Sequence, residues 1–230
     1  MANVENHLIE LLPRKDRVSL RAICEPVQLA LGDVLCEPGS QARYVYFPTD
    51  GFVSLVAHLE GYAGLEVGMV GREGMVGAHV ALGVMTSPLH GVVQGPGAAW
   101  RIGIVDFRRE LARSASLRRG LNRYVHVLMT QLAASAGCLR FHLIRPRLAR
   151  WLLMSQDRAH ADNFRVTHES LSNMLGVRRV GVTTAAVDLQ RSGLIEYHRG
   201  ALTVRDRQGL EAAACSCYAF DRKAYAGAID

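Results

Sequence analysis

The stretch that decides the fold is MLGVRRVGVTTAAVDLQ, residues 174–190. A helix is predicted to end at Gly176, because glycine tolerates the left-handed conformation in which many helices stop. A second helix is predicted from about residue 178 to residue 191. Its inner face repeats apolar residues at i, i+4 and i+7, namely Val182, Ala186 and Leu189. Two helices joined by a short turn that contains glycine have the pattern of a helix-turn-helix.

The outer face of the second helix is polar and basic. It holds Arg178, Arg179, Thr183, Thr184, Asp188 and Arg191. The first turn of a recognition helix enters the major groove, where arginine can bind guanine O6 and N7 and threonine can contact a thymine methyl or a phosphate. Gly181 is expected on this face too, since bulk there would keep the helix out of the groove.

A hairpin is predicted directly after this helix. Residues 195–198 and 201–204 alternate apolar and polar side chains around Arg199 and Gly200. Such a hairpin is a wing, and its tip carries an arginine that can bind a phosphate. A glycine-centred helix pair also occurs inside ordinary helical cores. The wing and the outward arginines favour DNA binding over that alternative.

The positive charge of the chain is concentrated around this motif. Residues 140–207 hold twelve arginines, no lysine and six acidic residues, an excess of six positive charges that equals the formal net charge of the whole chain, +6. A basic region beside a nearly neutral one is typical of a protein with a polyanionic partner, and a solvated basic face is the alternative.

Length and composition predict a soluble cytoplasmic protein of one large or two small domains. The chain has 230 residues, of which 49% are hydrophobic, and no apolar run approaches the roughly 18–20 residues of a membrane span. The N-terminus carries glutamates where a signal peptide needs an apolar centre. No membrane partner is expected.

The five cysteines form no disulfide framework, because they are odd in number and scattered. Cys215 and Cys217 lie in GLEAAACSCYAF, residues 209–220, which is predicted to be one helix. Two residues that are two apart on a helix point roughly 200° apart, which is poor geometry for one metal ion. The sequence therefore predicts no metal site, and small residues at a helix-packing face are favoured over a redox or metal role.

The first half of the chain is rich in glycine. Fourteen of the 22 glycines lie between Gly32 and Gly103. Short β-rich runs lie among them at residues 44–47, 52–56, 65–70 and 91–94. Such spacing predicts an antiparallel sandwich, barrel or roll.

A long helix is predicted from about residue 116. Apolar or small residues recur on it at spacings of four and three, at Leu121, Val125, Leu128, Leu132, Ser135 and Leu139. This seam could pack on its own domain or pair with a second copy of the chain, and the dimer is preferred. Pro146 suits the first turn of a further helix. The predicted domains are therefore residues 1–115, 116–143 and 144–230.

The chain resembles the catabolite activator/FNR (CRP/FNR) superfamily of bacterial transcription regulators over nearly its whole length. The resemblance rests on LGDVLCEPGSQARYVYFPTDGFVSLV, GMVGREGMVGAHVALG, the long helix and FRVTHESLSNMLGVRRVGVTTAAVDLQRSGLI. It implies an α+β fold with an N-terminal antiparallel β-roll like a cyclic-nucleotide-binding domain, a long dimerisation helix and a C-terminal winged helix-turn-helix. It further implies a homodimer that reads pseudo-palindromic double-stranded DNA, an effector-sensing roll and RNA polymerase as a further partner. The expected DNA contacts are Thr167, Arg178, Arg179, Val180, Thr183, Thr184 and Arg199.

The departures from the family pattern bear on the effector. The Gly-Glu and Arg-Ser pairs that hold a cyclic nucleotide fall at Gly77-Ala78 and Pro88-Leu89, so cyclic AMP is not expected in the usual manner. The effector is unknown, and its expected surroundings are Gly71, Glu73, Gly77, Thr130 and Ser135. Arg179 matches the first base-reading arginine of the family. Val180 and Thr184 replace two further family residues, which predicts a different target sequence.

The sequence is compatible with two alternatives. The chain could be a ligand-responsive sensor without sequence-specific DNA binding. It could also be a haem- or redox-sensing member that uses Cys215, Cys217 or a histidine of the roll. No catalytic triad, paired-carboxylate motif or phosphate loop is found in the sequence, and no enzyme activity is predicted.

Overall fold

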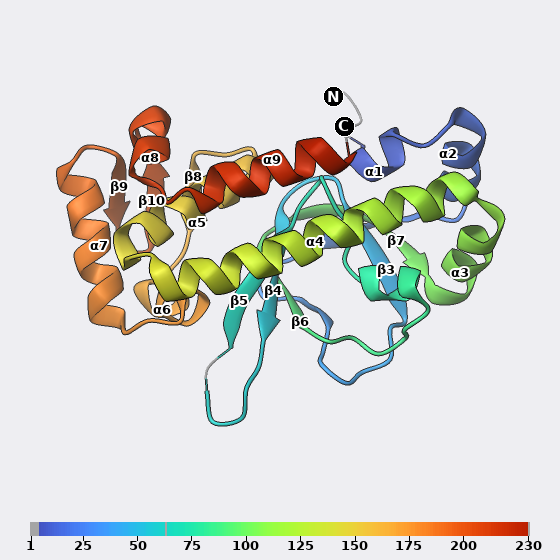
Figure 1. The fold of residues 1–230 in the computed structure, drawn as a ribbon, viewed down its shortest axis with the longest axis horizontal. Helices are drawn as coiled ribbons and strands as arrows, with labels where there is room; N and C mark the ends of the chain where they lie inside the picture. The colour runs from blue at the N-terminus through green and yellow to red at the C-terminus, as the bar shows by residue number, and fades with distance from the viewer. Residues whose placement is uncertain (1–4, 63, 230) are drawn as a thin grey trace.

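Residues 25–103 form an N-terminal β-roll of two antiparallel sheets. The computed structural model describes residues 5–62 and 64–229 (Figure 1). One sheet has the order β1 (Glu25–Leu29), β7 (Gly97–Gly103), β3 (Tyr44–Pro48). The other has the order β2 (Val34–Cys36), β6 (His90–Gly95), β4 (Phe52–Ala57), β5 (Leu65–Val70). The four strands predicted from the sequence are confirmed as β3 to β6, and β1, β2 and β7 add to them.

The inner faces of the two sheets form the core of the roll, and β4 is buried on both faces. Val53 of β4 lies opposite Val70 of β5 and Val93 of β6, and all three side chains are fully buried. Short helices surround the roll: α1 (His7–Glu10) and α2 (Arg14–Arg21) precede it, η1 (Ala78–Leu82) joins β5 to β6, and α3 (Ile104–Arg113) follows β7.

The long helix is α4 (Ala115–Phe141), close to the predicted bounds. Ser114 caps it, because its side chain accepts a hydrogen bond from the Leu117 amide. In Figure 1 the helix lies across the roll and reaches the C-terminal part of the chain. Leu117, Leu121 and Tyr124 pack into the core of the roll.

The predicted apolar seam of α4 mostly serves this internal packing. Leu121 is 1% exposed, and Val125 and Leu128 pack against the same core. Leu139 is partly buried, and only Leu132 of the predicted set is exposed. Apart from Ala115 and Phe141 at its two ends, the apolar surface that α4 leaves exposed consists of Met129, Leu132, Ala133 and Ala136, called here the exposed α4 stripe, and only Leu132 belongs to the predicted seam.

The C-terminal region is built on α5 (Ile144–Ala159), which contains Pro146 in its first turn, as predicted. Every residue from Arg147 to Gln156 is buried, because the other elements surround this helix. They are β8 (Asn163–Arg165), α6 (His168–Leu175), α7 (Arg179–Arg191), β9 (Ile195–His198), β10 (Ala201–Val204) and α8 (Arg207–Ala213).

The last helix, α9 (Cys217–Ile229), leaves the winged domain and runs back along α4 toward α1 (Figure 1). Ile229 joins the roll core, and Tyr225 hydrogen-bonds His7. The prediction of a single helix over residues 209–220 was wrong, because α8 ends at Ala213 and α9 begins at Cys217, with non-helical residues between them. Within residues 5–62 and 64–229, no helix is long and apolar enough to cross a membrane.

Candidate nucleic-acid interface and effector cavity

The helix-turn-helix is formed by α6 and α7. Thr167 caps α6, because its side-chain oxygen accepts a hydrogen bond from the Ser170 amide at 3.0 Å. The helix ends at Gly176, whose φ is +61°, in the left-handed region that was predicted. Leu171 and Leu175 are buried against α5 and α7, which fixes the angle of the pair. The local sequence therefore determines both ends of α6.

The second helix presents the predicted two faces. Val182 and Leu189 are fully buried and Ala186 is 3% exposed. The outer face is exposed at five predicted DNA contacts, Arg178, Arg179, Val180, Thr183 and Thr184. Arg178 is the non-helical N-cap, so α7 begins at Arg179. Among the described residues neither arginine forms an ion pair, and both guanidinium groups are available to an anion.

Gly181 has a packing role that the sequence did not indicate. A Cβ atom at this glycine would lie 2.5 Å from Cδ1 of Ile144, the first residue of α5. Its small size therefore allows α7 to pack closely on α5. The apolar residue that the outer face does expose is Val180, at 68%.

His168 is a residue of this site that sequence reasoning missed. Its Nδ1 lies 3.0 Å from Thr183 Oγ1, and its ring stacks on Tyr197 of the wing with centroids 4.6 Å apart. Burial, and secondarily the charge of Arg179, lowers the pKa of His168, so its imidazole is neutral near pH 7. This contact joins α6, α7 and the wing. A lone histidine after a helix cap gives no sequence signal for it.

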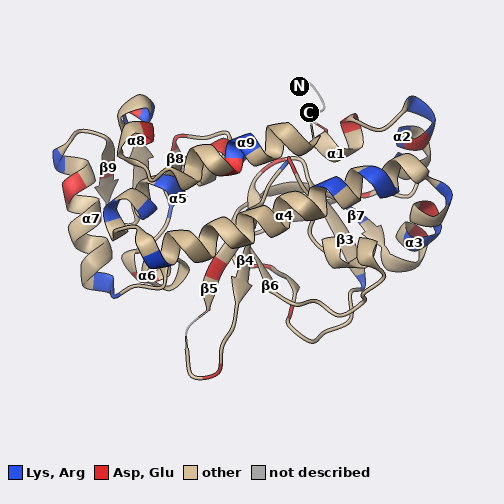
Figure 2. Cartoon of the chain, viewed as in Figure 1, with Lys and Arg blue, Asp and Glu red and all other residues tan. Residues whose placement is uncertain are grey.

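The wing is confirmed as the hairpin β9–β10. Arg199 and Gly200 form its turn with φ of +49° and +82°, and the guanidinium-bearing residue is exposed at the tip. β8 pairs with β10 and completes a three-stranded sheet. Figure 2 shows basic positions at both ends of α7 and an acidic one between them, Asp188. The basic groups that could bind phosphates thus flank the helix.

The five residues expected around an effector do not converge on one place. Gly71 packs against Arg158, and Gly77 precedes η1 with φ +90° beside Val45. Thr130 donates a hydrogen bond to the His126 carbonyl. Ser135 accepts one from Arg150. Of the five, only Glu73 lines the cavity described next.

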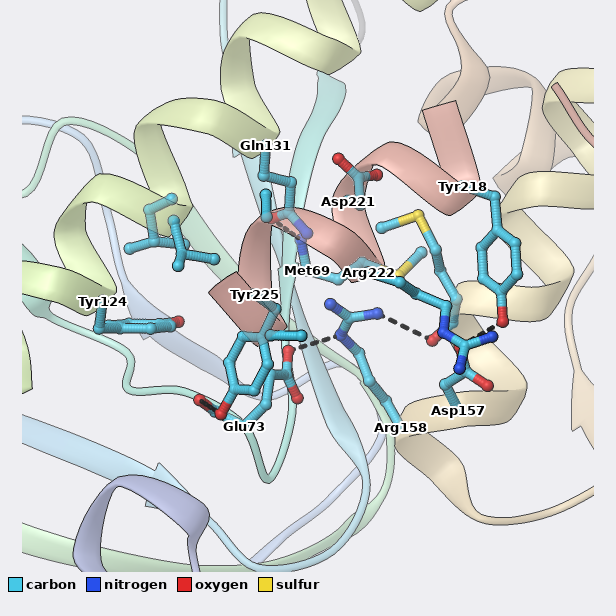
Figure 3. Close-up of a pocket in the computed structure, with 15 residues that line it drawn as sticks. Met69, Glu73, Tyr124, Gln131, Asp157, Arg158, Tyr218, Asp221, Arg222 and Tyr225 are labelled. Carbon is cyan, nitrogen blue, oxygen red and sulfur yellow. Dashed lines mark hydrogen bonds and ion pairs between the residues drawn. The ribbon is translucent and has the colours of Figure 1, made fainter. Parts of the chain in front are cut away.

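This cavity lies between α4, α9, α5 and the end of β5, and it has a volume of about 320 Å³ (Figure 3). It is called here the α4–α9 cavity. Apolar, aromatic and charged residues of α4, α5 and α9 line it together with two residues at and after the end of β5: Met69, Glu73, Tyr124, Val127, Leu128, Gln131, Met154, Asp157, Arg158, Tyr218, Asp221, Arg222, Ala224, Tyr225 and Ala226. A concave site with mostly apolar walls and a few polar groups is typical of small-molecule binding.

Two buried polar atoms in the α4–α9 cavity have no hydrogen-bond partner within the described residues. They are the Tyr124 hydroxyl and Asp221 Oδ1. Burial raises the pKa of both side chains. Other polar groups are already committed, since Arg158 Nε donates to Glu73 Oε1 at 2.8 Å and the Tyr218 hydroxyl donates to Asp157 Oδ2 at 2.8 Å. A buried donor and a buried acceptor without partners favour a polar ligand.

One protein-family model and several solved structures resemble this chain. Residues 146–213 match the family model of the Crp-like helix-turn-helix domain. No curated protein matches the sequence significantly. FixK2 from Bradyrhizobium japonicum superposes with a TM-score of 0.70 at 15% identity, over 84% of this chain and 98% of that chain.

Two further solved structures have a similar fold. A transcriptional regulator of the CRP/FNR family from Thermus thermophilus matches with a TM-score of 0.63 at 22% identity, over 83% of this chain and 98% of its own. CLP, the c-di-GMP-responsive global regulator of Xanthomonas campestris, matches with a TM-score of 0.64 at 17% identity, over 84% of this chain and 99% of its own. At these identities the likeness shows a shared fold.

Proposed function

We propose that this chain is a CRP/FNR-type regulator that reads a pseudo-palindromic DNA site as a homodimer; residues 146–213 match the Crp-like helix-turn-helix family model, and the fold resembles that of a CRP/FNR-family regulator. The coarser statement, that it is a CRP/FNR-type transcription regulator with a helix-turn-helix DNA-binding domain, follows from the family match and the shared fold. The matched family and structures are transcription regulators, not enzymes. The observation that carries the finer proposal is the exposed outer face of α7.

Base reading is assigned to the first turn of α7. Arg178 and Arg179 are exposed and free of ion pairs within the described part of the chain, so a guanine would not have to displace a carboxylate. The Thr183 and Thr184 hydroxyls donate to the carbonyls of Arg179 and Val180, and the Thr183 oxygen also contacts His168 Nδ1, so the Thr184 oxygen is the freer acceptor. Val180 supplies an apolar surface suited to a thymine methyl.

Backbone contacts are assigned to the flanking groups. The α6 N-terminus behind Thr167 presents amides and the positive end of a helix dipole to a phosphate, and the wing tip presents Arg199. These contacts orient α7 and carry no sequence information by themselves.

Dimerisation is assigned to the exposed α4 stripe. Met129 is 63% exposed and Leu132 is 37% exposed, and Ala133 and Ala136 lie beside them on the same face of the helix. Small residues allow a second helix to approach closely, and the two larger side chains supply apolar area. A two-fold axis at this stripe would place two α7 helices on one side of a duplex, at half-sites about 34 Å apart.

The effector site is assigned to the α4–α9 cavity. Its unpartnered Tyr124 hydroxyl and Asp221 oxygen favour a small polar molecule that can both accept and donate hydrogen bonds. Ala78, Pro88 and Leu89 supply no charge for a cyclic phosphate in the manner usual for the family. Because α9 forms one wall of the cavity and α4 the other, a ligand bound here would contact α4, the proposed dimer helix. The regulator is proposed to act in the cytoplasm, with RNA polymerase as its further partner.

Selection from random duplex DNA with the purified 230-residue chain tests the proposal. We expect enrichment of a pseudo-palindrome whose half-sites are centred about one helical turn apart. Affinity for the enriched site should fall steeply as salt rises, because bound arginines release counterions from the phosphates. Recovery of no enriched motif would indicate a ligand-responsive sensor without sequence-specific DNA binding and would reject the proposal.

A further inference from the structure

Four potential metal ligands meet where the winged domain joins the long helix. Cys138 lies in the last turn of α4, and His142 is the residue that ends that helix. Cys215 lies in the link between α8 and α9, and Cys217 is the first residue of α9. The three sulfur atoms and one histidine nitrogen all lie within 4.8 Å of one another. Residues far apart in the sequence therefore converge on one point.

The chain path explains why both cysteines near the C-terminus reach this point. One continuous helix would direct Cys215 and Cys217 to opposite sides, which was the reason no metal site was predicted. Because the helix is interrupted after Ala213, the two cysteines do not share one helix, and both thiols face the end of α4. Cys138 and His142 are four residues apart, so they lie on one side of the helix end.

Two of the distances between ligand atoms match those around a single tetrahedral ion. Cys138 Sγ lies 3.5 Å from Cys215 Sγ, and Cys217 Sγ lies 3.5 Å from His142 Nδ1. With Zn–S bonds of about 2.3 Å and Zn–N bonds of about 2.0–2.1 Å, tetrahedral ligand atoms lie roughly 3.5–3.8 Å apart. An iron–sulfur cluster distributes its thiolates over several irons and needs them farther apart than one shared ion does.

We propose that Cys138, His142, Cys215 and Cys217 bind one Zn²⁺ ion in a closed structural site. Three thiolates and one imidazole form a ligand set typical of structural zinc, with no position left for a reacting water. The site ties the end of α4 to the start of α9 across the α4–α5 junction, where His142 and Leu143 have extended backbone. The ion thus fixes the winged domain relative to the long helix.

The surrounding charges are those that such a site requires. Three thiolates around one Zn²⁺ carry a net negative charge, and two buried arginines, Arg147 and Arg150, line a small cavity together with Cys138. Arg150 is paired with Asp221 at 2.6 Å. Arg147 donates to the Leu175 carbonyl and has no carboxylate partner among the described residues. A buried guanidinium is costly without a counter-charge, and the metal–thiolate group supplies one.

Metal binding by the reduced full-length chain tests the site directly. Metal-free protein is titrated with Co²⁺ alone and then with Zn²⁺ alone, and zinc is also counted in protein purified from zinc-supplemented cells. We expect one ion per chain, and visible and thiolate charge-transfer bands of tetrahedral Co²⁺ that Zn²⁺ abolishes. Cys217→Ser and His142→Gln should lower zinc from one per chain to nearly zero. The control Cys36→Ser, a cysteine of the roll, should keep one.

Several results would overturn the proposal. They are the absence of Co²⁺ bands in the wild type, equal zinc content in Cys217→Ser and wild type, and a Cys138–Cys215 disulfide that forms in place of metal binding. Circular dichroism checks that each variant folds. If a variant does not fold, the Co²⁺ titration of the wild type alone decides whether the metal site exists. Removal of zinc should also raise amide hydrogen exchange at residues 138–146 and 213–218, and unchanged exchange there would reject the tie between the two helices.

A consequence for DNA rests on the proposed function. Because the ion fixes the winged domain on α4, removing it should lower affinity for the selected DNA site, by tenfold or more. If neither form binds DNA specifically, the proposed function fails, whereas the metal count still decides whether the zinc site exists.

Discussion

Replacing Glu66 by glutamine should change how the stability of the protein depends on pH. Glu66 lies on β5, and its carboxylate accepts hydrogen bonds from Trp151 Nε1 of α5 at 2.9 Å and from the Ser54 hydroxyl of β4. It therefore links the roll to the C-terminal domain. Burial raises the pKa of Glu66 to about 7 from an ordinary value of 4.5, and the opposing effects of its two hydrogen bonds and of Arg150 and Arg158 are smaller.

The sign and size of the effect follow from linkage. The folded chain holds a proton on Glu66 more tightly than the unfolded chain does, so the stability from this group is complete below about pH 4.5. That contribution is lost as pH rises toward and through 7, because folding then buries a carboxylate that water would solvate better. At about 1.4 kcal/mol per pKa unit, the loss between pH 5 and pH 8 is at most roughly 2–3 kcal/mol.

Urea unfolding of wild type and Glu66→Gln at pH 5 and pH 8 measures this loss. Glutamine keeps the size of the side chain and an acceptor for Trp151, and it does not titrate. We expect the stability of the wild type relative to Glu66→Gln to fall by up to about 3 kcal/mol between the two pH values. Glu60→Gln, an exposed carboxyl of the same hairpin, should show no such trend. A pH-independent difference for Glu66→Gln, or one that grows in favour of the wild type as pH rises, would refute the reasoning.

Four further substitutions, one of them a control, test the helix ends, the helix core and the proposed dimer interface. Gly176→Ala should destabilise the protein by about 1–2 kcal/mol, since φ is +61° there. The control Gly120→Ala, in the second turn of α4 where a Cβ atom would meet no neighbour, should be neutral or stabilising; thermal unfolding of both variants checks the sign. Leu189→Ala, at a fully buried position of α7, should cost about 2–5 kcal/mol in urea unfolding, and a cost below 1 kcal/mol would contradict its place in the core. Met129→Glu should convert the proposed dimer to a monomer in light scattering, and an unchanged mass would exclude the exposed α4 stripe as the interface.

The sequence predicted those parts of the fold that local chemistry determines. Glycine and β-branched residues marked the strands β3 to β6, and Thr167 and Gly176 marked the two ends of α6. The inner face of α7 was readable because its apolar period can be satisfied in only one orientation. These features depend on residues close together in the chain.

Other features depend on contacts between distant segments and could not be read in this way. An apolar repeat on α4 shows which residues are buried but does not show what they pack against. Leu121, for example, packs into the core of the roll. Gly181 is small because Ile144 packs against it from another helix. The break between Ala213 and Cys217 carries no glycine or proline, so the convergence of the four metal ligands had no local signal.

The central claim, that the first turn of α7 reads bases, is tested most directly by Arg179→Ala. Binding of this variant is measured against the selected site and against every single-base change in it, beside Arg113→Ala, an exposed arginine of α3. We predict a loss of about 1–3 kcal/mol for the selected site, together with loss of preference at one position of each half-site. Arg113→Ala should match the wild type. An equal loss on all sequences, or no loss at all, would contradict base reading by Arg179.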